Sequence, residues 1–225
     1  METLLLGSVE GQAVEPLTRW LEIIALHKPR LQGDFTKEMA GKCLDVISSA
    51  AQDQRILQLL LATFAEYIKE LHSEEQTALV RKYFALLMNQ HISTRDSASK
   101  ALSNIRSSLA DVHEFKVGLA NLLTNIEREI KTSDLLQYRS VCDAVLKESD
   151  LLGDYQFRDL TELSKRLLSQ SEPSQQDFGL SIIERTPQIP GADRSEIDHL
   201  LSEIEGSSPT LKERAARLLQ RTKVE

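Results

Sequence analysis

The chain has 225 residues, of which 41% are hydrophobic and 5% aromatic, and its formal net charge at pH 7 is −7. Nucleic-acid binding ordinarily requires a basic excess that neutralises phosphates, so the acidic balance disfavours that function unless a local basic face overrides it. Nine glycines and six prolines are too few for a turn-rich all-β fold, and helices are favoured. No apolar run approaches the ~18 residues that span a bilayer, and residues 1–11 lack the basic start of a signal peptide. We therefore expect a soluble cytoplasmic protein without a membrane partner.

The predicted helices of the first third of the chain follow from apolar residues at helical spacing. The first, residues 13–27, carries an apolar face that includes the only tryptophan, Trp20, for which core packing is expected. Asp34 caps a second helix. Residues 53–72 form a third helix that is apolar on many sides, as expected of a helix packed between neighbours.

The later helix starts are marked by capping residues and first-turn prolines. They fall at Ser73, Ser93, Asp111, Thr132 or Ser133, Asp154, Pro173, Asp193 and Pro209. Gly206 stands where a helix C-cap glycine belongs. The pattern predicts eleven helices with short connections and no strands.

Alternate predicted helices share a register in which a small or apolar residue is followed at +3 and +4 by two more. The six sets are Leu17/Trp20/Leu21, Leu57/Leu60/Leu61, Ala98/Ala101/Leu102, Tyr138/Val141/Cys142, Gly179/Ile182/Ile183 and Ala215/Leu218/Leu219. Their first members are 40, 41, 40, 41 and 36 residues apart. A two-helix period near 40 residues predicts an all-α fold, an α-solenoid of about six antiparallel helix pairs, because each pair must stack on the next to bury its apolar faces. A plain helical bundle is the alternative.

The predicted solenoid is a single domain that covers residues 1–225. Its repeats lie approximately at 13–50, 53–90, 93–131, 132–170 and 171–206, and residues 207–225 form a capping helix.

Two copies carry a more specific pattern. Residues 94–102 (TRDSASKAL) resemble the second helix of a HEAT repeat, in which a hydrophobic–Arg pair precedes an Ala-rich stretch, and residues 211–219 (LKERAARLL) are similar. The other four copies keep the register but lose the arginine, and Gln54, Leu135 and Gln176 stand in its place in three of them. The resemblance to the HEAT/armadillo family implies the solenoid fold and says little about function.

The sequence contains no recognisable catalytic motif, so we predict that the protein is not an enzyme. The chain contains no GxxxxGK[ST], GxGxxG, HExxH or GxSxG sequence, so we predict no catalytic, cofactor-binding or metal-ligating residue. The five histidines are scattered near predicted helix ends, where solvated or capping roles are usual. Cys43 and Cys142 lie in separate amphipathic patterns and are expected to be buried free thiols.

The candidate partner-binding residues are basic. Arg19, Lys100 and Arg217 each follow a register residue by two positions, and Arg139 follows one directly. In HEAT-type solenoids the second helices line one surface, often the concave one, so these four residues could form a broken basic stripe there. The alternative is that they are ordinary solvated helix charges.

A second basic group lies in the last predicted helix. Arg214, Arg217 and Arg221 share one helical face and could bind phosphate or carboxylate. The alternative is charge pairing within the terminal hairpin, with the acidic residues of segment 193–206.

Three functions are compatible with these observations. The repeat architecture, the acidic balance and the lack of catalytic motifs favour a non-catalytic scaffold or adaptor that binds a protein partner through the concave surface. A nucleic-acid-binding protein with the architecture of HEAT-like DNA glycosylases is the second hypothesis. The third is the helical arm of a larger ATPase or assembly.

Overall fold

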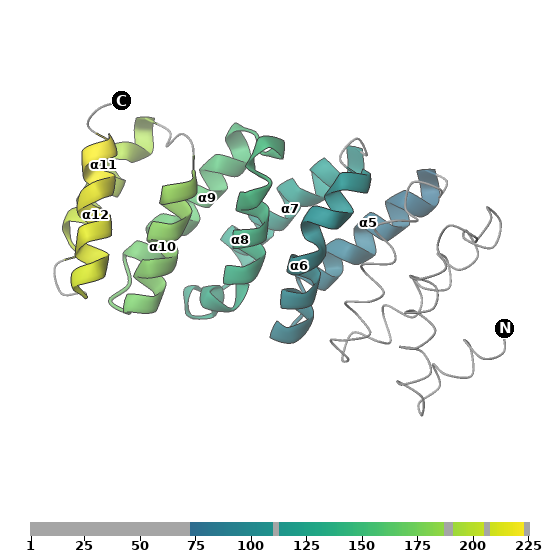
Figure 1. Cartoon of the computed structure of the whole chain (residues 1–225), viewed down its shortest axis with the longest axis horizontal. Helices are drawn as coiled ribbons and strands as arrows, with labels where there is room; N and C mark the ends of the chain where they lie inside the picture. Colours follow the sequence, from purple (N-terminus) through teal and green to yellow (C-terminus); the bar gives the residue numbers. More distant parts are fainter. Residues whose placement is uncertain (1–72, 110–112, 187–190, 205–207, 223–225) are drawn as a thin grey trace. The chain divides into compact units, whose positions relative to one another are not determined.

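Figure 1 shows the computed structural model, which describes residues 73–109, 113–186, 191–204 and 208–222. The predictions that lie outside the described residues concern the first repeat, residues 53–72 of the second, and Arg19, Trp20, His27, Cys43, His72, Asp111 and Gly206. Every regular element in the described ranges is a helix, which confirms the all-α class. None of these helices combines the length and the apolar character that are needed to cross a membrane.

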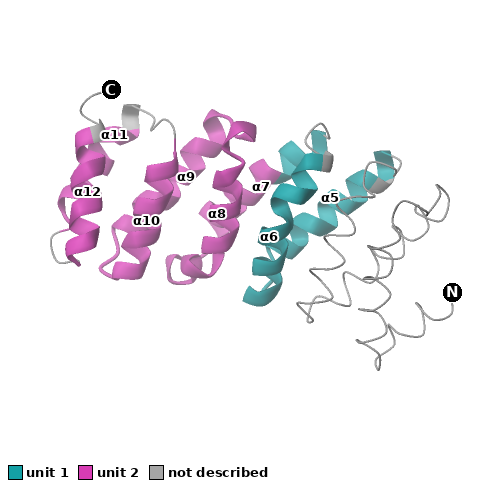
Figure 2. Ribbon diagram, in the orientation of Figure 1, with its two compact units in different colours: residues 1–118 teal, residues 119–225 magenta. Residues whose placement is uncertain are grey.

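The chain divides into two compact units, residues 1–118 and 119–225 (Figure 2). The boundary falls inside helix α7 (His113–Glu129), so this helix contributes to both units. The expectation of a single domain stays a prediction.

In the first unit, α5 (Ser73–Leu87) packs against α6 (Ile92–Leu109), and both helices begin within one residue of the predicted starts. The buried Tyr83 hydroxyl donates a hydrogen bond of 2.8 Å to the backbone carbonyl of Ala98 and so links the two helices. The Phe84 ring lies 5.7 Å from that of Tyr83, between ring centroids. A Cβ on Gly118 would clash with the Phe84 ring, so the approach of α7 to α5 requires glycine there.

The second unit consists of two layers of helices (Figure 1). One layer holds α8 (Arg139–Lys147), α10 (Pro173–Arg185) and α12 (Pro209–Thr222), in which α10 contacts both neighbours. The other holds α9 (Asp154–Leu168) and α11 (Gly191–Ser202), which contact each other and cover α10 and α12 respectively. Apolar residues from the two layers form one core, which comprises Leu168, Leu180, Ile183, Ile197, Leu201, Ile204, Leu211, Ala215 and Leu218.

The local starts of these helices follow the sequence signals. Pro173 and Pro209 open α10 and α12, where a missing backbone N–H costs nothing. Asp154 opens α9, and the preceding Gly153 donates its N–H to the Gln156 side chain at 2.9 Å. The predicted start at Asp193 is two residues late, because α11 begins at Gly191.

The helix predicted to begin at Thr132 or Ser133 is not α-helical in its first seven residues. Residues Thr132–Tyr138 form a 3₁₀ helix, η4, and the α-helix begins only at Arg139. Side chains three residues apart align along a 3₁₀ helix, and Leu135 and Tyr138, which have this spacing, are both buried. The tighter winding therefore points both residues into the core. A short 3₁₀ turn, η5 (Ser149–Leu151), joins α8 to α9.

The register residues of the four described copies lie on α6, on η4 and α8, on α10 and on α12. All of them are buried except Leu219, which is partly buried. Gly179 shows why a small residue stands in this register, because a Cβ there would lie 2.9 Å from Leu168 Cγ on α9. The repeat period itself stays a prediction.

The residue three positions before the first register residue makes a similar hydrogen bond in two copies. Arg95, which is almost fully buried, donates to the backbone carbonyl of Asn89 in the turn before α6. Gln176 donates to the carbonyl of Gln170 in the turn before α10, at 2.8 Å. In each case the acceptor lies six residues before the donor. Glutamine in the later copy therefore makes the same kind of hydrogen bond as arginine in the earlier copy.

Candidate functional site

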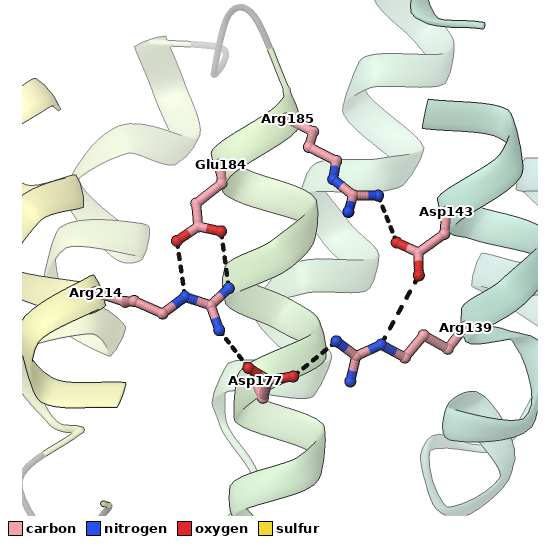
Figure 3. Close-up of polar contacts among 6 residues, drawn as sticks. All are labelled: Arg139, Asp143, Asp177, Glu184, Arg185 and Arg214. Carbon is pink, nitrogen blue, oxygen red and sulfur yellow. Dashed lines mark hydrogen bonds and ion pairs between the residues drawn. The ribbon is translucent and has the colours of Figure 1, made fainter. Parts of the chain in front are cut away.

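Six charged residues form a continuous chain of ion pairs across the layer of α8, α10 and α12 (Figure 3). We call this set the ion-pair ladder; its members are Arg139 and Asp143 on α8, Asp177, Glu184 and Arg185 on α10, and Arg214 on α12. Helical spacing places the members of each helix together, since residues four, seven or eight apart share a face. The ladder thus joins three helices that are distant in sequence.

Asp177 is the centre of the ladder. Arg139 Nη2 lies 2.7 Å from its Oδ2 atom, and Arg214 Nη1 donates to its Oδ1 atom. Partial burial alone would raise the pKa of Asp177, but the hydrogen bonds and positive charges of Arg139 and Arg214 outweigh it and lower the pKa. The carboxylate is therefore ionised near neutral pH and holds two helices to α10.

Arg214 uses its whole guanidinium within the ladder. Its Nε and Nη2 atoms donate to the two carboxylate oxygens of Glu184, each at 2.8 Å, while Nη1 binds Asp177. Such two-bond pairs are the strongest arginine–carboxylate contacts because the planar fork matches both oxygens. Only 18% of the Arg214 side chain is exposed, which is consistent with this enclosure.

Asp143 forms the other end of the ladder and lies between two arginines. Its Oδ1 atom accepts from Arg185 Nη1 at 2.6 Å, and its Oδ2 atom lies 3.9 Å from Arg139 Nε. The Arg139 guanidinium also lies over the Phe178 ring, 5.7 Å from the centroid, where a cation–π attraction adds to its placement. Arg139 is therefore held from three sides.

The opposite layer is joined by a separate charged cluster. Lys165 of α9 donates to Glu162 at 2.9 Å and to Asp193 and Glu196 of α11 at 2.8 Å each. Burial would lower the pKa of Lys165, but the three carboxylates raise it well above its usual range. The next residue, Arg166, donates to the backbone carbonyls of Glu127 and Ile130 near the end of α7.

These contacts correct the charge pairing expected in the terminal hairpin. Arg214 pairs with Asp177 and Glu184 of α10, whereas Asp193 and Glu196 of the acidic segment pair with Lys165 of α9. The physical reason is that the faces of α11 and α12 that carry these charges meet the preceding helices of their own layers.

The binding residues predicted from the sequence occupy different environments in the structure. Arg139 and Arg214 are brought together on Asp177, and Arg217 is 66% exposed with its Nη2 atom 4.0 Å from Glu213. Lys100 is exposed on α6 of the first unit. Arg19 and the Arg221 side chain lie outside the described residues.

Sequence reasoning missed Asp143, Asp177, Glu184 and Arg185. A signal for part of this set exists in the repeat register. Arg139, Asp177 and Arg214 each lie within two positions of a register residue, and their charges alternate in sign from one copy to the next. Charges that alternate in sign near the register of successive helices indicate pairing across the layer, not a stripe of one sign.

The cysteine and the three histidines of the described ranges lie outside the ladder. Burial, with a smaller contribution from the Asp143 charge, raises the pKa of the Cys142 thiol to about 12, and this cysteine is a free thiol as predicted. His91, His113 and His199 are exposed, and His199 Nδ1 lies 3.6 Å from Glu203. In the described ranges no group of three or more His, Cys, Asp or Glu side chains is arranged to hold a metal ion.

The fold and the ladder define the described part of the chain as an all-helical protein whose second unit has two helical layers, each joined by charged side chains. In comparisons with known proteins, no family model, no curated protein and no solved structure matches the chain.

Proposed function

We propose that the chain is a HEAT-like α-solenoid of the cytoplasm that acts as a non-catalytic scaffold and binds a protein partner. The surface we assign to the partner is the outer side of the α8, α10 and α12 layer, which we call the ladder face. It is defined by the ion-pair ladder and by Arg217, three residues beyond Arg214 on α12.

The observation that carries the proposal is the ion-pair ladder. It fixes six charged side chains on three helices at distances mostly of 2.6–2.8 Å, and all six keep part of their surface exposed. Side chains already ordered before binding lose less conformational entropy in a complex, so a fixed polar surface favours specific recognition. Electrostatic complementarity to such a surface sets partner choice and association rate.

The repeat interpretation is supported by two features of the described residues. The register residues of the four described copies are buried except for the partly buried Leu219, and Arg95 and Gln176 make the same hydrogen bond at equivalent positions. In a solenoid, successive second helices form an extended surface, and these proteins use such surfaces to bind partners. The α8, α10 and α12 layer would be that surface.

Site-specific photocrosslinking of the full chain tests the proposal. A benzophenone amino acid placed at Arg217 on α12 probes the ladder face, and one placed at the exposed Arg158 of α9 probes the opposite layer. Each variant is irradiated in lysate of the native cell, with and without nuclease treatment. We expect a discrete protein adduct from position 217 in both lysates and none from position 158.

Three outcomes would each overturn the proposal. An adduct lost on nuclease treatment, with nucleic acid in the untreated sample, would assign the face to nucleic acid. Equal protein adducts from both positions, or none from position 217, would show that the ladder face has no specific protein partner.

A further inference from the structure

Arg185 differs from the other ladder arginines in how its guanidinium is used. Its Nη1 atom donates to Asp143 at 2.6 Å, whereas its Nε and Nη2 atoms have no partner among the described residues (Figure 3). The side chain is 46% exposed. One edge of a fixed guanidinium, with two parallel N–H donors, is therefore without a partner in the described ranges.

Arg214 shows in the same ladder what this edge can hold. Its Nε and Nη2 atoms bind both oxygens of Glu184, each at 2.8 Å. The Nε–Nη2 edge of Arg185 has identical donor geometry, because the guanidinium is planar and rigid. A carboxylate from another molecule would meet there the same pair of donors that Glu184 meets on Arg214.

The open edge is held in place before any partner arrives. Arg185 is fixed through Asp143, whose second oxygen faces Arg139, and Arg139 is fixed in turn by Asp177 and by the Phe178 ring. An arginine ordered by such neighbours loses less rotamer freedom on binding than a solvated arginine does.

We propose that Arg185 is a recognition residue for a partner carboxylate, and that the partner of the ladder face presents an acidic protein segment. This inference rests on the proposed scaffold function and names its partner class. The Nε–Nη2 edge of Arg185 would bind an Asp or Glu side chain of that segment through two parallel hydrogen bonds.

The charge of the ladder favours a protein carboxylate over a nucleic acid. Three arginines face three carboxylates within the ladder, so it offers no basic excess to neutralise a row of phosphates. The whole chain also carries a formal net charge of −7. One unpaired Arg185 edge, in a ladder whose positive and negative charges are equal in number, is suited to bind one carboxylate.

Fluorescence anisotropy with the full chain tests the inference. The probes are labelled Gly/Ser peptides that carry three Glu, three Gln or three phosphoserine residues, together with a single-stranded DNA oligonucleotide. We expect the Glu peptide to bind best. Arg185→Gln should weaken its binding at least about ten-fold, since a two-bond charged contact is lost, while the matched control Arg158→Gln on α9 should leave binding unchanged.

Arg185→Lys separates geometry from charge. It keeps the positive charge but removes the fork, so we expect most of the preference for Glu over Gln to be lost. Binding of the Lys variant equal to that of the unaltered chain would overturn the role of the edge. Equal binding of Glu and Gln peptides, or tighter binding of phosphopeptide or DNA, would overturn the carboxylate assignment.

The two proposals fail in different ways. If position 217 crosslinks to a protein but Arg185→Gln captures it as well as the unaltered chain does, the carboxylate inference fails and the scaffold function stands. If no protein is captured at the ladder face, the scaffold function itself fails. Unchanged circular dichroism of each variant confirms that the fold is intact.

Discussion

Arg139 of α8 and Arg214 of α12 bind the two oxygens of one carboxylate, that of Asp177 on α10. The two arginines come from helices that do not follow one another in the chain, and Asp177 is the residue through which both are joined. A single side chain thus links three helices of one layer. Its removal leaves two partly buried guanidinium groups without this partner.

We expect Asp177→Asn to lower the free energy of unfolding by about 1–2 kcal/mol, between the ~0.2–1 kcal/mol of an exposed ion pair and the ~3–5 kcal/mol of breaking a buried one. Urea denaturation followed by circular dichroism measures this difference. Glu129→Gln, at an exposed position at the end of α7, serves as the control and should change stability by no more than about 0.5 kcal/mol. An Asp177 variant as stable as the control would show that the ladder does not hold the layer together.

The pH dependence of the same pair of proteins provides an independent prediction. The pKa of Asp177 lies below its ordinary value of 3.8, so its ionised form is stabilised by folding. This contribution is fully present above the ordinary pKa and is lost as pH falls through the lowered one. The stability difference between the unaltered chain and Asp177→Asn should therefore be constant from pH 7 to about pH 5 and shrink below about pH 4. A difference that stays constant or widens in acid would contradict the lowered pKa.

Local chemistry explains why helix starts could be predicted and the ladder could not. Pro173, Pro209 and Asp154 open helices through effects confined to one turn, and the sequence shows that turn directly. The partners of Arg214 depend on which face of α12 meets α10, which no local pattern specifies. The acidic segment just before α12 therefore misled the prediction, because its Asp193 and Glu196 turn toward Lys165 instead.

The 3₁₀ start of η4 was missed for a related reason. Its Leu135 and Tyr138, both buried, have the spacing of an α-helix as much as that of a 3₁₀ helix, so the apolar pattern could not tell the two apart. The buried register was predictable because apolar periodicity of 3.6 residues reports burial along the whole helix.

Gly179→Ala should destabilise the chain, although the same change in an exposed helix ordinarily stabilises it by about 1 kcal/mol. The added Cβ would lie 2.9 Å from Leu168 Cγ, so α9 and α10 must separate or the leucine must move, at a cost of about 1–3 kcal/mol. Thermal or urea denaturation checks the sign.

A double-mutant cycle identifies the cause of that loss. Leu168→Ala removes the two closest atoms that the new methyl group would meet and leaves Leu167 Cβ, so Gly179→Ala should cost less in this background than in the unaltered chain. Equal costs in both backgrounds would place the strain elsewhere.

Gln176→Leu should lower stability by about 1 kcal/mol, because the carbonyl of Gln170 loses its hydrogen bond. Gln220→Leu, at an exposed position on α12, is the matched control and should have little effect. At the equivalent position of the earlier copy, Arg95→Gln should retain more stability than Arg95→Leu, since glutamine makes this bond in the later copy. Equal losses from both Arg95 variants would argue against the equivalence of the two positions.

Amide hydrogen exchange of the full chain, alone and with the protein captured at position 217, tests the central claim most directly. The account predicts that the partner slows exchange in α8, α10 and α12, with the largest effect near Arg185 and Asp143, while α9 and α11 are unchanged. Protection confined to α9 and α11, or absent from the ladder face, would contradict the assignment of the binding surface.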